Sequence, residues 1–144
     1  MMVYPQQAIQ SILRLSSQKR FEHAIKDIAD AECLYVMADE EGDWSFWGDD
    51  DGHTSLAIWS DLEFARLSLA QAGDENLCIF ELELEEFLED GIPYLMDIGS
   101  YIAIFPTPDD PETVDMPAIE FAARINKILD ESYGEALDLP YLNG

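Results

Sequence analysis

Apolar residues recur every three or four positions in five stretches of the chain, a spacing that places them along one face of an α-helix. The first two stretches lie near the N-terminus. Pro5 favours the first turn of a short helix, and Ser17 can cap a second helix that carries an apolar stripe. This stripe consists of Phe21, Ala24, Ile25 and Ile28.

The other three helices are predicted further along the chain. Ser60 and Glu63 have the spacing of a capping box, which predicts a helix from Ser60 to about Gly73. A short helix is predicted over 85–97, although one glycine and one proline interrupt its pattern. Its inward-facing residues are expected to be Phe87, Leu88, Leu95 and Met96. Asp115 is predicted to cap a long final helix.

Between the helices, short segments rich in β-branched and aromatic residues predict β-strands. These segments are 33–38, 43–47, 54–59, 77–84 and 101–105. Acidic, glycine-containing turns at 39–42 and 48–52 join the first three segments, which predicts an antiparallel meander. Trp59 ends an apolar strand and is expected in the core.

The order of these elements predicts the fold class α+β. We expect a mostly antiparallel sheet of about five strands with helices packed on it, two N-terminal helices and a long C-terminal helix. At 144 residues, the chain has the length of a single domain covering 1–144, with 134–144 expected to be a mobile tail.

The formal net charge of −24 favours some partners and disfavours others. No Lys or Arg occurs between Lys26 and Arg66, or between Arg66 and Arg124. Direct binding to nucleic acid or to an anionic membrane is therefore not expected, since both need a positive surface. A basic protein is the complementary partner. Alternatively, the acidity keeps the protein soluble, for example in a salty cytoplasm.

Other features of the sequence favour the cytoplasm as the default compartment. No apolar run is long enough to span a bilayer, and the first residues lack the layout of a signal peptide. Cys33 and Cys78 lie in apolar stretches, where we expect buried, reduced thiols; a disulfide or a reactive pair is the alternative.

The tryptophans of the predicted hairpin are candidates for contact with a partner. Side chains alternate along a strand, so Trp44 shares a face with Phe46 while Trp47 takes the other. Either the hairpin is covered on both sides, or Trp47 stands near the surface beside Asp49, Asp50 and Asp51. An aromatic ring beside carboxylates suits an Arg or Lys side chain. The predicted partner-binding residues are therefore Trp44, Trp47, Asp49, Asp50 and Asp51.

Candidate metal ligands and catalytic groups are few. Asp49, Asp51 and His53 are suitable ligand types, but their spacing is not that of a calcium loop, and the residues suit a tight turn equally well. His23 and Asp27 are interpreted as an ordinary surface pair on a helix. No nucleophile motif, phosphate-binding loop or zinc motif occurs, so neither a cofactor nor an enzyme activity is predicted.

Several short sequences, taken in order, resemble the bacterial domain of unknown function 2750 family over about 18–127. They are RFEH at 20–23, EEGDW at 40–44, an acidic turn ending at Gly52, LAIW at 56–59, EFA at 63–65, EFL at 86–88 and FPTP at 105–108. The resemblance implies a compact α+β domain and no established activity or catalytic residues. The chain departs from the family pattern at Ser60, where proline is common, and in its acidity.

The function predicted from these observations is a non-catalytic binding module for a basic protein partner, by analogy with acidic immunity proteins. One alternative is a small enzyme or metal-binding protein that uses the acidic turn at 49–53. Another is a nucleic-acid mimic, which would need its carboxylates arranged in rows like phosphates.

Overall fold

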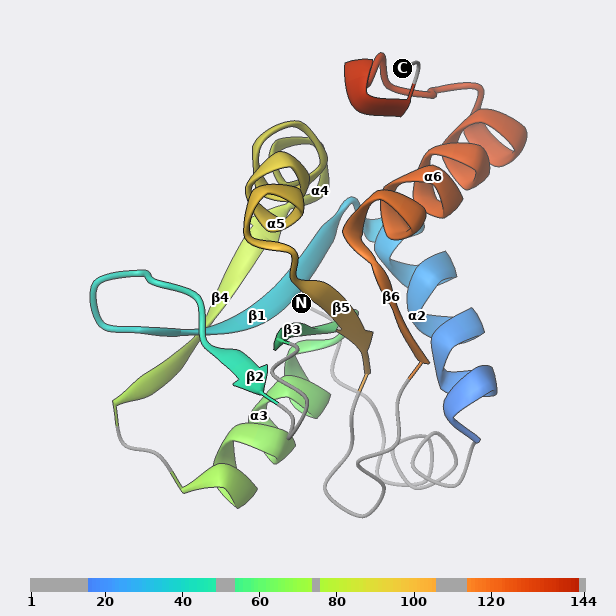
Figure 1. The fold of residues 1–144 in the computed structure, drawn as a ribbon. Helices are drawn as coiled ribbons and strands as arrows, with labels where there is room; N and C mark the ends of the chain where they lie inside the picture. Colours follow the sequence, from blue (N-terminus) through green and yellow to red (C-terminus); the bar gives the residue numbers. More distant parts are fainter. Residues whose placement is uncertain (1–15, 49–53, 74–75, 106–113, 143–144) are drawn as a thin grey trace.

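The computed structural model describes residues 16–48, 54–73, 76–105 and 114–142, and shows helices packed on a mixed sheet (Figure 1). The helices are α2 (Ser17–Ala31), α3 (Leu62–Ala72), α4 (Leu84–Glu86), α5 (Ile92–Ile98) and α6 (Ala118–Ile128). The strands are β1 (Cys33–Asp39), β2 (Phe46–Gly48), β3 (Thr54–Trp59), β4 (Leu77–Glu83), β5 (Tyr101–Ile104) and β6 (Val114–Pro117). The first predicted helix lies outside the described residues.

The strand order is β4-β1-β3-β5-β6, with β2 paired to β3 beside this path. All pairs are antiparallel except β3 and β5, which run parallel. The parallel pair is possible because the chain between β3 and β5 is long enough to contain α3, β4 and the helical segment 84–98. The predicted fold class, α+β with a mostly antiparallel sheet and packed helices, is confirmed.

The predicted meander is wrong in its strand order. β3 lies directly beside β1, with Tyr35 opposite Trp59 and Val36 opposite Ile58. The hairpin itself is reduced to a bridge between Ala38 and Trp44, after which β2 turns to pair with β3. β2 is only three residues long, too short to pair along the whole edge of β1. β3 pairs with that edge of β1 instead.

Helices cover both faces of the sheet. α3 lies on one face, against β1, β3 and β4, while α2, α6 and the segment 84–98 lie on the other (Figure 1). Strand residues facing either layer are therefore buried, including four consecutive residues at the end of β3. Trp59 is fully buried, as predicted.

Three predicted helix starts differ from the structure. Ser16, not Ser17, caps α2, and its side chain accepts from the backbone of Lys19. Asp61, not Ser60, occupies the N-cap of α3. Asp115 lies within β6, opposite Ala103, so α6 begins only after Pro117. Pairing with β5 keeps Asp115 extended and outside the helix.

The predicted helix over 85–97 forms part of a longer helical run from α4 to α5. A π-helical segment, η1 (Phe87–Gly91), connects α4 to α5 and contains the glycine of the interrupted pattern. Pro93 lies in the first turn of α5, where proline is tolerated. Phe87, Leu88 and Leu95 are buried as predicted, but Met96 is 40% exposed, because it points away from the sheet side of the helix.

The end of the chain packs onto the domain. After the π-helical segment η2 (Leu129–Tyr133), the side chain of Asn126 exchanges two hydrogen bonds with the backbone of Leu137. Leu139 is buried, and the hydroxyl of Tyr141, within the 3₁₀ helix η3 (Pro140–Leu142), donates to the carbonyl of Leu88 at 2.6 Å. The predicted extended tail therefore has little regular structure but is anchored through 142.

Cys33 and Cys78 are both half-buried and are not joined to each other. Cys78 lies near the carbonyl of Ala38, at 3.6 Å from its sulfur. No helix among the described residues is both long and apolar enough to cross a membrane.

Candidate functional site

A pocket of about 380 Å³ opens between the turn that follows β1 and the helical run 84–98. Its apolar wall is aromatic. Trp44 packs against Phe87 with ring centroids 5.7 Å apart and meets Tyr94 edge-on at 6.0 Å. Phe87 is buried, Trp44 is half-buried, and Tyr94 is 51% exposed, so the aromatic wall extends from the core to the solvent.

Gly91 brings the tryptophan close to the helix. A Cβ at this position would lie 2.8 Å from Cδ1 of Phe87 and 3.0 Å from Cη2 of Trp44. Both distances are shorter than a relaxed carbon contact, so only glycine leaves room for the two rings as they are packed.

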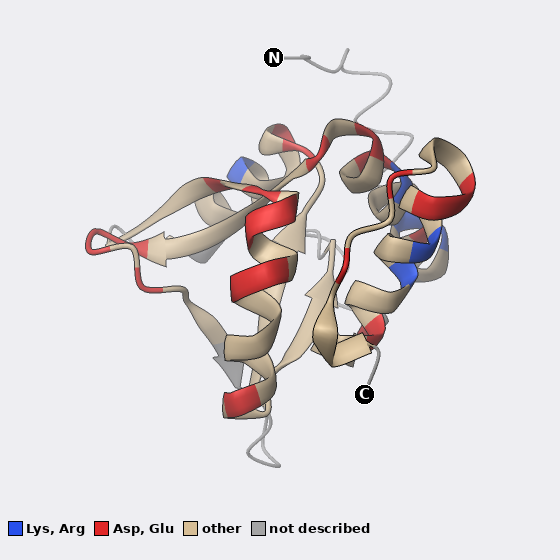
Figure 2. Ribbon diagram, turned by 90° about the horizontal axis from the view of Figure 1, so that it is seen from above, with Lys and Arg blue, Asp and Glu red and all other residues tan. Residues whose placement is uncertain are grey.

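Carboxylates surround this aromatic wall. Asp43, Glu83, Glu86 and Asp90 all line the pocket and are exposed. No Lys or Arg of the described residues lines it. Among the described residues, Lys and Arg occur on α2 and α6 and, as Arg66, on α3. Figure 2 shows acidic residues in bands along the helical run 84–98. The pocket therefore combines aromatic faces with uncompensated negative charge.

Among the predicted partner-binding residues, Trp44 is the one whose side chain the structure describes, and it lines this pocket. Trp47 lies in β2 with its backbone opposite Ser55, and its side chain is outside the described part of the structure. Asp49, Asp50, Asp51 and the weak metal candidate His53 also lie outside the described residues.

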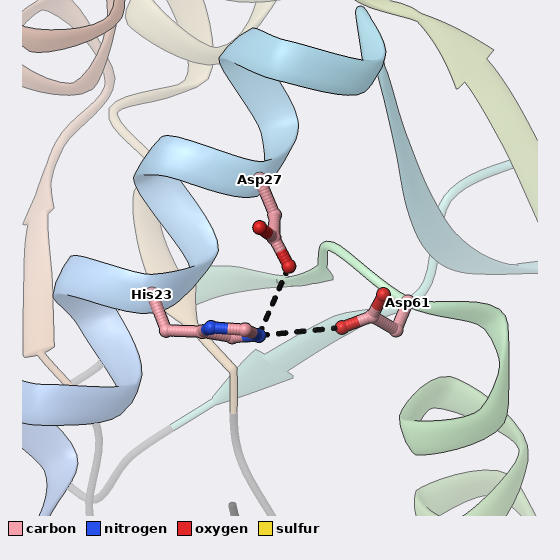
Figure 3. Close-up of side chains that lie close together, drawn as sticks. All are labelled: His23, Asp27 and Asp61. Carbon is pink, nitrogen blue, oxygen red and sulfur yellow. Dashed lines mark ion pairs between the residues drawn. The ribbon is translucent and has the colours of Figure 1, made fainter. Parts of the chain in front are cut away.

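A second cluster joins α2 to the start of α3. Nε2 of His23 lies 3.0 Å from Oδ2 of Asp27, one turn later on α2, and 3.7 Å from Oδ2 of Asp61 (Figure 3). All three side chains are partly shielded, with exposed fractions of 28%, 34% and 15% for His23, Asp27 and Asp61. The interpretation of His23 and Asp27 as an ordinary surface pair was therefore incomplete.

The two carboxylates change the acid–base behaviour of the imidazole. The close polar contact with Asp27, and then that with Asp61, raises the pKa of His23 to about 9, although partial burial opposes the change. Nε2 is nevertheless buried without a hydrogen-bond partner of good geometry among the described residues. The contact between His23 and Asp27 is therefore an ion pair without the alignment of a hydrogen bond. The short distance between the charges is sufficient to raise the pKa of the imidazole.

Neighbouring residues fix the positions of the three side chains. The hydroxyl of Ser60 donates to Oδ2 of Asp61 at 3.1 Å. The ring of His23 meets Phe105 edge-on, with centroids 6.2 Å apart. One turn before His23, the buried Arg20 donates from Nε to the carbonyl of Phe105, which connects α2 to the end of β5. The cluster therefore rests on packed core elements.

A protein-family model described as "Protein of unknown function (DUF2750)" matches residues 21–125, which is more than half of the chain. The chain belongs to the DUF2750 family. No curated protein matches it. Every described residue of the pocket and of the His23 cluster lies inside the DUF2750 match.

Sequence reasoning missed most of both sites in this DUF2750 protein. Asp43 directly precedes Trp44, but the other three carboxylates of the pocket, Glu83, Glu86 and Asp90, lie on a strand end and a helical run that are distant from Trp44 in sequence. One local signal was present: Glu86 and Asp90 are four residues apart and share a helix face. Asp61 had no such signal, because 38 positions separate it from His23 in the numbering.

Proposed function

We propose that this DUF2750 protein is a binding module for a basic protein, and that the pocket beside Trp44 receives a Lys or Arg side chain of that partner. The observation that carries the proposal is the combination, in one pocket, of four exposed carboxylates with an aromatic wall in which Trp44 is half-buried and Tyr94 is exposed. Such a pocket suits an organic cation, because the ring faces attract the charge while the carboxylates neutralise it.

The two components contribute differently to binding. A cation over an aromatic face is worth about 0.5–1 kcal/mol when exposed and about 2 kcal/mol when desolvated. Exposed ion pairs add less than about 1 kcal/mol each, and salt screens them. The aromatic wall would therefore hold the bound side chain, whereas the acidic surface would speed the encounter.

The proposal is tested with a peptide of alternating arginine and glycine and a pair of matched double variants. Glu86→Gln with Asp90→Asn removes two charges from the pocket. Glu85→Gln with Asp97→Asn removes two exposed charges from the same helical run that do not line the pocket. The long-range field changes equally in both, so a local site predicts that only the first variant weakens binding, by about tenfold or about 1.4 kcal/mol.

Tyr94→Ala provides a test of the aromatic wall with little risk to the fold, because Tyr94 is half exposed. It should speed dissociation of the peptide while leaving the salt dependence of association unchanged. If the two double variants weaken binding equally and Tyr94→Ala has no effect, the peptide senses only the net charge, and the pocket is not the binding site.

A further inference from the structure

We propose that His23, Asp27 and Asp61 bind a divalent transition-metal ion. The cluster is separate from the pocket beside Trp44, and the inference does not depend on the proposed binding of a basic partner. It starts from the arrangement in Figure 3, where one imidazole nitrogen and two carboxylates converge from α2 and from the N-cap of α3.

The spacing of the three ligand atoms is close to that of a coordination shell. One atom from each residue lies within 4.8 Å of the other two. Ligands held at about 2.0–2.2 Å around a tetrahedral ion are roughly 3.3–3.6 Å apart. The distances from His23 to Asp27 and Asp61 already bracket that range, at 3.0 and 3.7 Å. Three of the four positions of such a shell would therefore be supplied by the protein.

The orientation of His23 favours a cation over a simple hydrogen bond. Nε2 is buried and lies 3.0 Å from a carboxylate oxygen, yet it has no hydrogen-bond partner of good geometry among the described residues. A proton on Nε2 needs one acceptor in line with it, whereas a metal ion can bind a nitrogen and two oxygens that surround a common point.

The contacts around the cluster resemble those that support metal ligands. Ser60 donates to Asp61 at 3.1 Å, an outer contact that fixes the carboxylate. Asp61 is the N-cap of α3, but its side chain makes no capping hydrogen bond. Its carboxylate is therefore available to the cluster instead of to its own helix.

The ligand types indicate which ions would bind. One imidazole with two carboxylates and no thiolate suits Zn²⁺, Co²⁺, Mn²⁺ or Fe²⁺, whereas Ca²⁺ and Mg²⁺ prefer shells made of oxygen alone. Three protein ligands leave at least one position for water, as in sites where the ion is accessible to small molecules.

The test uses Zn²⁺ and Co²⁺ with the full chain, in the presence of excess Mg²⁺ so that weak binding to the 31 carboxylates is saturated. Calorimetry should detect a single stoichiometric site, and Co²⁺ should acquire a visible spectrum typical of nitrogen and oxygen ligands. His23→Asn and Asp61→Asn should each reduce affinity at least as much as the roughly 10–100-fold that loss of an outer contact costs. Ser60→Ala should reduce it within that range.

His53→Asn is the matched control, because His53 is the other histidine of the chain and lies in the sequence segment 49–53 with three aspartates. It should leave the site intact. Circular dichroism verifies that each variant is folded. If His23→Asn does not fold, the affinity of the Ser60→Ala variant still tests the site. The proposal is overturned if no stoichiometric site is found, if binding survives His23→Asn and Asp61→Asn, or if His53→Asn abolishes it.

Discussion

Trp59→Ala tests the core packing at the end of β3, directly before Ser60 and Asp61 of the His23 cluster. Trp59 is fully buried at the end of β3, opposite Tyr35 of β1, and its chain continues into Ser60 and Asp61. A buried tryptophan removes up to about 250 Å² from water, which at about 25 cal/mol per Å² gives an upper estimate of about 6 kcal/mol. Measured truncations of buried aromatic residues cost about 3–5 kcal/mol, and we expect this range.

Urea unfolding followed by far-ultraviolet circular dichroism measures the loss, because the signal does not depend on the removed fluorophore. Trp59→Phe is the control: it keeps one ring in the cavity and should lose clearly less stability than alanine. Since small domains are stable by about 5–15 kcal/mol, the alanine variant should remain measurable only at low urea. A loss below about 1 kcal/mol would refute the reasoning and place Trp59 outside the core.

Three further predictions concern charge, the chain end and the pocket. The melting temperature should rise between low salt and about 0.5 M NaCl, because ions screen the repulsion of a chain with net charge −24; an unchanged value in thermal scans would contradict this. Tyr141→Phe removes the hydrogen bond to Leu88 and should cost about 0.5–1.5 kcal/mol, with faster amide exchange over 137–142 if the anchor is real. Gly91→Ala should lower the free energy of unfolding by about 1–3 kcal/mol, because the added methyl group clashes with Phe87 and Trp44. The higher helix propensity of alanine offsets up to about 1 kcal/mol of this loss. Tryptophan emission should change as Trp44 moves, and an unchanged emission would argue against the close packing.

Local patterns predicted the elements well because their causes are local. The apolar stripe of α2 follows from side-chain periodicity within one segment. The alternation of apolar and acidic residues over 80–84 likewise predicted the strand β4, although the burial of its residues does not alternate in the structure. Pairing is different. β3 pairs with β1 on one edge and runs parallel to β5 on the other, and no turn sequence specifies either neighbour. The short turns predict a meander, but β2 is only three residues long and pairs with β3, so β3 lies beside β1 instead.

The same limit explains why the aromatic hairpin was only partly understood. Alternation predicts that Trp44 and Phe46 share one face of the strand; in the structure both are half-buried, as is Ser45 between them. What covers Trp44 could not be read from the hairpin, since Phe87 and Tyr94 come from a helix about forty residues later. The acidic pocket exists because that helix presents its carboxylates beside the tryptophan.

Asp61 is where a local rule fails. An Asp at an N-cap normally accepts from the first turn of its own helix, an interaction worth about 0.5–2 kcal/mol. In α3 this capping bond is absent, and the carboxylate instead approaches His23 on another helix. The contacts with His23 and Ser60 must therefore offset a lost cap. Positions where local preference gives way to a long-range contact tend to be functional or strained. Of the two sites, the His23 cluster is thus the one that folding preferences alone explain least.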